Sequence, residues 1–155
     1  MADALDNYKS LVKRIHLLLK EQGMPFKKDG FTLRWIEEEA TPKIARIVNF
    51  QRSWYGTKDC IRFTINLGLL KEYGDRPIPP KLKEWECPIR ERPASWTEKY
   101  PCDKWWEVTA TTDMEVLYQE LRELTMESIL PFFREQGALP KKEGSMSIVG
   151  VEQKE

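Results

Sequence analysis

The chain has 155 residues and a mass of 18.3 kDa, the size of one domain that can bury about 70% of its unfolded surface. Hydrophobic residues make up 41% and charged residues 32%, which excludes a disordered chain, a collagen-like repeat and a membrane-spanning protein. The 25 basic residues balance the 25 acidic ones, which disfavours binding to nucleic acid or to an anionic membrane through overall charge.

Cysteine and histidine are too few and too dispersed to indicate a metal site or a disulfide framework. The three cysteines are Cys60, Cys87 and Cys102, without a C-x-x-C pair, and the single histidine is His16. The N-terminal sequence lacks the basic region and the apolar run of a secretory signal. We therefore expect a cytosolic protein with reduced thiols, without a metal and without another cofactor.

One helix is predicted near each end of the chain. From Asp6 to Gln22 apolar residues recur at helical spacing, with Asp6 as the N-cap and Gly23 at the end. The second helix is predicted from Met114 to Gln136, and Pro131 inside it should kink or split it. Five of its apolar residues are expected to be buried, namely Val116, Leu117, Leu121, Leu124 and Ile129.

Strands are predicted between these helices, because apolar and polar residues alternate there. The first covers Phe31–Trp35, with Phe26–Lys28 as an optional hairpin partner, and the second covers Ala45–Ser53. The third, Cys60–Leu70, is the clearest, because its odd positions from 61 to 69 are apolar and its even positions from 62 to 68 are polar or small.

Most of the prolines lie between residues 71 and 104, which predicts an irregular excursion with one short strand near Pro88–Arg92. A last strand is expected at Trp105–Val108. This order predicts an α+β domain over residues 1–137, in which an antiparallel sheet of about four to five strands carries the N-terminal and C-terminal helices on one face. Residues 138–155 lack periodicity, and we expect a mobile tail there.

If the helices cover the odd-numbered side of the third strand, its even-numbered side is left open. Alternation places polar residues of several strands on that open side, and Arg90 and Arg92 join them if Ile89 is a core residue. One of Trp105 and Trp106 must also face this way, and we take Trp105 as the candidate. The candidate ligand-binding residues are thus amides, arginines and one indole: Asn49, Gln51, Asn66, Arg90, Arg92 and Trp105.

The chemistry of this face suits an anionic or planar ligand, or an acidic protein surface. Arginine binds carboxylate or phosphate through paired hydrogen bonds, amides add directional donors and acceptors, and an indole offers a stacking surface. The competing explanation is the ordinary solvated side of an antiparallel sheet, where arginine and threonine are common. Asparagine is depleted in strands, so Asn49 and Asn66 favour a site over that explanation.

Five sequence runs stand out when taken together: GxPFKK from Gly23, VNFQRS from Val48, FTINLG from Phe63, IRER from Ile89 and KWWE from Lys104. They resemble the bacterial family catalogued as domain of unknown function 4304. The likeness covers about residues 8–137. The function of the family is not established, so the resemblance implies one bacterial cytosolic domain and no particular reaction.

Two classes of function remain open. The first is a non-enzymatic binding module, immunity-like or regulatory, that holds an anionic small molecule or a protein partner. The second is an enzyme acting on a phosphorylated or carboxylated small molecule, where Arg90 and Arg92 would hold the anion and Glu91 or Glu107 would carry a proton. Common nucleotide-binding and hydrolase motifs are absent from the sequence, which favours the binding module.

Overall fold

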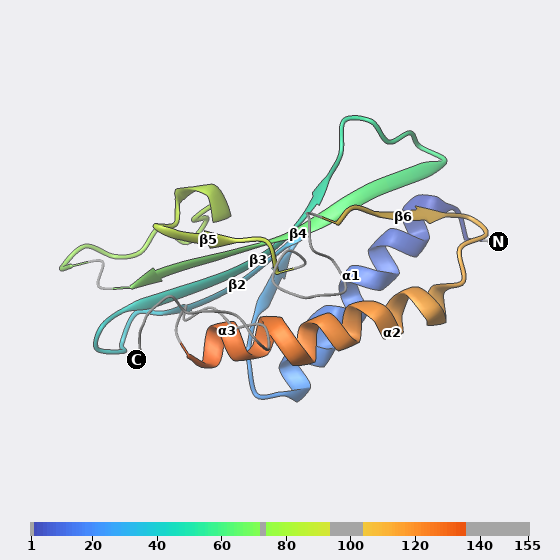
Figure 1. The fold of residues 1–155 in the computed structure, drawn as a ribbon. Coiled ribbons are helices and arrows are strands. Elements are labelled where there is room, and N and C mark those ends of the chain that lie inside the picture. Colours follow the sequence, from blue (N-terminus) through green and yellow to red (C-terminus); the bar gives the residue numbers. More distant parts are fainter. Residues whose placement is uncertain (1, 72–73, 94–103, 136–155) are drawn as a thin grey trace, which may run out of the picture.

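A mixed architecture of helices and one antiparallel sheet is seen in the computed structural model, which describes residues 2–71, 74–93 and 104–135 (Figure 1). In chain order the elements are α1 (Ala4–Glu21), β1 (Lys27–Asp29), β2 (Thr32–Glu37), β3 (Ile44–Arg52), β4 (Cys60–Lys71), the 3₁₀ turn η1 (Glu84–Glu86), β5 (Ile89–Glu91), β6 (Trp106–Thr109), α2 (Met114–Leu124), the π-helical segment η3 (Thr125–Ile129) and α3 (Leu130–Arg134).

The sheet has the strand order β1-β2-β3-β4-β5, and β6 also pairs with β4. All these pairings are antiparallel. β4 has 12 residues, so two short strands share its outer edge: β5 pairs with residues 67–69 and β6 pairs with residues 60–63. The predicted α+β class with an antiparallel sheet is therefore confirmed.

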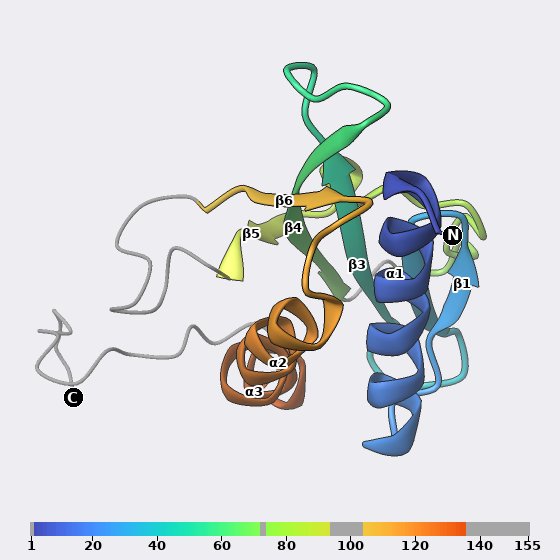
Figure 2. The same cartoon turned by 90° about the vertical axis from the view of Figure 1, so that its right-hand side faces the viewer.

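The helices cover a single face of this sheet, as predicted (Figure 2). The larger hydrophobic core joins residues of α1, α2 and α3 to the odd-numbered residues of β4 from 61 to 69. Tyr8 of α1 lies at its centre, with its ring 4.8 Å from that of Phe31 and 5.1 Å from that of Phe63. None of the described helices crosses a membrane, since each is too short or too polar.

Two details of the helices differ from the sequence expectation. α1 begins at Ala4 with Asp3 as its N-cap, and Asp6 instead completes a capping box by bonding back to the Asp3 backbone. The expected cap at Asp6 is wrong because an equivalent carboxylate stands one turn earlier. Val116 was expected in the core, yet it is 64% exposed, because the apolar stripe of α2 runs through Leu117, Leu121 and Leu124.

The predicted interruption near Pro131 is confirmed as a π-helical turn. Proline has no N–H to continue the helical ladder, and η3 directly precedes the α3 turn that contains Pro131. The Thr125 hydroxyl donates to the Leu121 carbonyl at 2.8 Å within this region. The predicted end at Gln136, the domain boundary at 137 and the tail 138–155 lie outside the described residues.

The opposite face of the sheet is not open along its whole length, and this part of the expectation is wrong. Residues of the proline-rich excursion fold back over one half of it and build a second, smaller core. That core joins three sheet residues to three residues of the excursion: Ala45, Ile47, Leu70, Ile78, Leu82 and Cys87. The approach is close because Gly68 has no side chain: a Cβ atom there would lie 2.9 Å from Cys87 Sγ.

Candidate functional site

The amides of β3 and β4 meet on the uncovered half of this face. The pairing places Asn49 opposite Asn66, and Gln51 lies two residues further along β3, on the same face. The Asn66 side-chain nitrogen donates to Gln51 Oε1 at 2.7 Å and to Asn49 Oδ1 at 3.2 Å. Asn49 in turn donates to the hydroxyl of Thr32 on β2 at 3.0 Å. Three of the predicted site residues are therefore joined by direct hydrogen bonds.

Arg92, which follows β5, joins the same cluster. Its Nε donates to Asn66 Oδ1 at 2.9 Å, and a terminal nitrogen lies 3.4 Å from Gln51 Oε1. Its guanidinium carbon lies 5.5 Å from the centre of the Trp105 ring, within the range of a cation–π contact. We call this set, Asn49, Gln51, Asn66, Arg92 and Trp105, the amide cluster.

The choice between the two adjacent tryptophans is decided by the pairing of β6. Trp106 lies opposite Phe63 and is 3% exposed, with the two rings stacked at 5.7 Å. Its indole nitrogen donates to Glu120 at 2.9 Å. Because neighbours in a strand alternate, Trp105 lies on the side of the amide cluster.

Arg90 is the one candidate that lies outside the amide cluster. Its Nε donates at 2.8 Å to the nearly buried carboxylate of Glu84 on η1. Glu91 pairs with Leu67 and so faces the helix-covered side, while Glu107 lies 3.5 Å from Arg62 Nε. Of the groups considered for catalysis, Arg90 and Glu107 are thus each engaged in an ion pair, and Glu91 lies on the opposite face.

The polar atoms of the amide cluster are largely hydrogen-bonded to one another. Asn66 is 5% exposed and uses both its oxygen and its nitrogen within the cluster, while Gln51 is exposed. Next to the cluster, Trp105 lines a cavity of about 300 Å³ together with Ser53, Tyr55 and Arg62. A ligand in this cavity would therefore contact Trp105 of the cluster and the β3–β4 connection.

That connection carries two aromatic residues that the sequence reasoning treated only as part of a loop. Trp54 is 98% exposed and Tyr55 is 85% exposed. Figures 1 and 2 show that the ends of β3 and β4 and their connection extend away from the rest of the molecule. A tryptophan–tyrosine pair inside a short loop is itself a sequence signal for an exposed contact surface.

The sequence matches the family described as a domain of unknown function, DUF4304, over residues 15–135. The chain belongs to the DUF4304 family. No curated protein and no solved structure matches it. In this DUF4304 chain, the amide cluster and the β3–β4 connection both fall within the matched residues.

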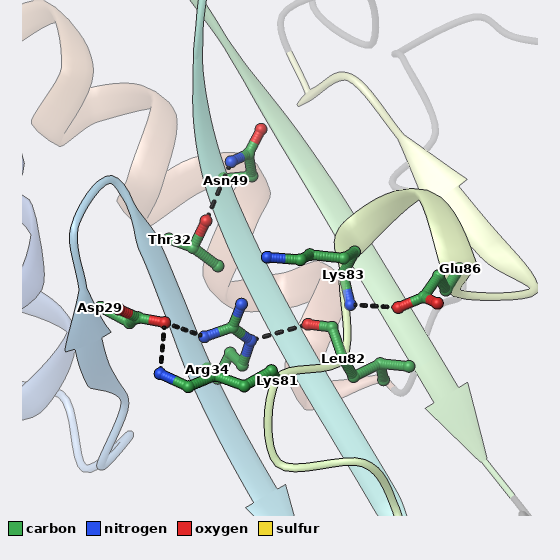
Figure 3. A network of polar contacts seen from close by, with 8 residues as sticks. All are labelled: Asp29, Thr32, Arg34, Asn49, Lys81, Leu82, Lys83 and Glu86. Carbon is green, nitrogen blue, oxygen red and sulfur yellow. Dashed lines mark hydrogen bonds and ion pairs between the residues drawn. The ribbon is translucent and has the colours of Figure 1, made fainter.

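A second polar group of the DUF4304 domain lies where the β1–β2 hairpin meets the excursion (Figure 3). Asp29 Oδ2 accepts from Arg34 at 2.8 Å and from Lys81 at 3.0 Å. These hydrogen bonds hold the pKa of the Asp29 carboxyl at about 2, below its usual 3.8. Sequence reasoning missed this group, because Lys81 is 52 residues away from Asp29 along the chain.

Metal-ligating and thiol groups are dispersed in the part of the domain that the structure describes. No cluster of three or more histidine, cysteine or acidic residues capable of holding a metal ion occurs there. Cys60 is partly exposed, Cys87 is buried, and both are free thiols. Burial and the nearby Glu84 raise the pKa of the Cys87 thiol to about 12. A nucleophilic role for Cys87 is therefore disfavoured.

Proposed function

We propose that this DUF4304 domain is a non-enzymatic binding module, cytosolic and bacterial, that holds an acidic surface of a protein partner. The observation that carries the proposal is the near-complete exposure of Trp54 and Tyr55 on the β3–β4 connection. Tryptophan, tyrosine and arginine are the residues that most often dominate the energy of protein interfaces. An exposed pair of large aromatic side chains costs solubility, and burial in an interface removes that cost.

The charges around this pair favour an acidic partner. Arg52 and Lys58 are exposed and lie within four residues of the aromatic pair along the chain, and Arg62 lies at the start of β4. The negative charges in this region are those of the exposed Asp59 and Glu107. Three cations against two carboxylates leave this end of the sheet positive, although the whole chain has no net charge.

The amide cluster supports the proposal as a rigid base. Hydrogen bonds hold Arg92 and the cation–π contact holds Trp105 against it, so less side-chain entropy remains to be lost there when a partner docks. The adjoining cavity of about 300 Å³ is at the lower end of the range for small-molecule sites, and it has the size to receive a side chain of the partner. A protein surface therefore fits this end better than a substrate does.

The enzyme alternative has less support. It needs Arg90 and Arg92 on one anion, with a carboxylate beside them. Arg90 is instead paired with Glu84, and Glu91 faces the helices. Because these anion-binding and proton-transferring groups do not converge, we prefer a binding module to an enzyme.

The test is a comparison of two tryptophan-containing surfaces. Tagged wild-type protein, a Trp54→Ser/Tyr55→Ser variant and a Trp85→Ser variant would be used to capture partners from the native host. Trp85 on η1 is 64% exposed, so it is a matched control for loss of an exposed indole. The captured protein would then be purified and titrated by calorimetry.

The proposal predicts a partner that the Trp54→Ser/Tyr55→Ser variant binds at least about 30-fold more weakly, since the loss of even one hot-spot residue costs about 2 kcal/mol or more. The Trp85→Ser variant should bind as the wild type does, and added salt should weaken binding. Equal capture by the wild type and the Trp54→Ser/Tyr55→Ser variant would refute the proposal, as would a captured protein with no affinity once purified.

A further inference from the structure

Arg34 is a buried arginine in which one terminal nitrogen has no hydrogen-bond acceptor among the described residues. Its side chain is only 7% exposed. Nε donates to the Leu82 carbonyl at 2.7 Å and one terminal nitrogen donates to Asp29 at 2.8 Å. The other terminal nitrogen makes no hydrogen bond to any residue that the structure describes. A guanidinium held so deeply by two partners is fixed in position, and its third nitrogen is available to a ligand or to water.

Positive charge around Arg34 exceeds the negative charge that balances it. Asp29 Oδ2 forms ion pairs with both Arg34 and Lys81, so one negative charge balances two positive charges. Figure 3 shows the side chain of Lys83 reaching across the sheet toward the same region as the third nitrogen of Arg34. Lys83 has no ion pair among the described residues. The single carboxylate shared by Arg34 and Lys81 leaves an excess of positive charge here, which favours the entry of an anion.

Asp29, Arg34 and Lys81 border a cavity of about 590 Å³. This volume is typical of sites for small organic molecules. Four cationic side chains line it: Lys27, Lys28, Arg34 and Lys81. Of the two carboxylates in its wall, Asp29 is engaged as described, and Glu38 accepts from the Ile78 N–H at 2.6 Å and lies 3.4 Å from Lys43. Lys27 and Lys28 form no ion pair within the described residues.

The remaining wall of the cavity is apolar. Pro25, Ile36, Ile78 and Pro80 line it together with the indole of Trp35. One face of that indole is already covered by the Arg46 guanidinium, whose carbon lies 3.8 Å from the ring centre. A ligand that fills this cavity therefore contacts both cationic and hydrocarbon groups.

We infer that this cavity is a binding site for a small organic phosphate, whose phosphoryl group lies against Arg34 and Lys81 and whose carbon skeleton lies against the apolar wall. A phosphate carries close to two negative charges at neutral pH and offers three acceptor oxygens, so it satisfies several cations that are not coplanar. A carboxylate carries one charge and fits this arrangement less well. The site shares no residue with the partner-binding surface, so either proposal can fail alone.

The experiment is a calorimetric titration with three matched probes. Phenyl phosphate has both the anion and an apolar ring, inorganic phosphate has only the anion, and benzoate has the ring with a single negative charge. We expect phenyl phosphate to bind most tightly, and each of the other two probes to bind several-fold more weakly. Absence of phenyl phosphate binding at millimolar concentration would overturn the inference, and so would equal binding of inorganic phosphate or of benzoate.

Two lysine variants separate a specific site from general charge attraction. Lys81 is 73% exposed in its side chain, so Lys81→Gln removes a charge from the cavity without opening the core. It should weaken phenyl phosphate binding about tenfold, the effect of losing roughly 1.4 kcal/mol. Lys58→Gln makes the same change on the β3–β4 connection and should leave the affinity unchanged. An equal loss in both variants would show that phosphate binds only through overall charge.

Discussion

Asn66 lies directly opposite Asn49 in the pairing of β4 with β3, and a hydrogen bond of 3.2 Å joins their side chains. The same Asn66 nitrogen also reaches Gln51, and its oxygen receives Arg92. One nearly buried amide thus connects three neighbours that come from two other segments of the chain. Its loss would leave several polar groups without their partner at once.

Asn66→Ala should therefore destabilise the fold. The variant removes the hydrogen bonds that Asn66 makes with Arg92 Nε and with the Asn49 oxygen in a part-buried place, so the free energy of unfolding should fall by about 1–3 kcal/mol. Urea denaturation followed by circular dichroism measures this. Gln51→Ala is the control, because Gln51 is exposed and water can replace its contacts. A cost for Asn66→Ala no greater than for Gln51→Ala would show that the cluster does not stabilise the sheet.

Asp29 should make the stability of the domain depend on acid. Its carboxyl pKa is lowered to about 2 in the folded protein, mainly by the hydrogen bonds from Arg34 and Lys81. A carboxyl with a lowered folded pKa stabilises the protein above its unfolded pKa, and that contribution disappears as pH falls through the folded value. Wild type should therefore be more stable than Asp29→Asn near neutral pH.

The difference should shrink between about pH 4 and pH 2 and vanish below that range. Urea denaturation of both proteins across this interval measures it, and a carbon-detected NMR titration of the Asp29 carboxyl checks the pKa directly. A stability difference that stays constant down to pH 2 would contradict the assignment, because it would then come from packing rather than from charge.

Local alternation in the sequence was sufficient to predict most of the sheet face. β4 alternates strictly, so the side of Asn66 followed from parity, and the same rule placed Asn49, Gln51 and Arg92 beside it. Which of Trp105 and Trp106 is buried could not be predicted, because both are equally hydrophobic and only the register of β6 on β4 separates them.

The excursion was beyond sequence reasoning for a different physical reason. Its prolines indicate irregular structure but not where that structure packs. Ile78, Leu82 and Cys87 reach the sheet through contacts that are distant along the chain, and no period marks them as core residues. For the same reason the Asp29–Lys81 pair and the cavity beside it could not be predicted from either segment alone.

The two described thiols should differ in reactivity. Cys87 is 4% exposed, and burial raises its pKa to about 12, so almost none of it is thiolate at pH 8. Cys60 is partly exposed. In a Cys102→Ser background, iodoacetamide at pH 8 should modify Cys60 faster than Cys87. Peptide mass spectrometry at successive times measures the two rates. Labelling in urea is the control, because both thiols are then exposed. If the two cysteines are labelled equally fast in urea and also in the native protein, Cys87 is not buried.

Gly68 should be intolerant of any side chain, because the excursion packs directly on it. A Cβ atom at this position would lie 2.9 Å from Cys87 Sγ and 3.2 Å from the backbone oxygen of Glu84. Gly68→Ala should therefore lower the free energy of unfolding by about 1–3 kcal/mol, the usual cost of overpacking a closely packed site. Thermal and urea denaturation measure the change.

A double-mutant cycle tests the cause. Cys87→Ala removes the sulfur atom that the new methyl group would meet, so the two substitutions should be coupled rather than additive. The Gly68→Ala/Cys87→Ala protein should be more stable than the sum of the single changes implies, by about 0.5 kcal/mol or more. Part of the cost should remain, because the Glu84 carbonyl is backbone and cannot be removed. Strict additivity would mean that the excursion does not press on β4 at Gly68.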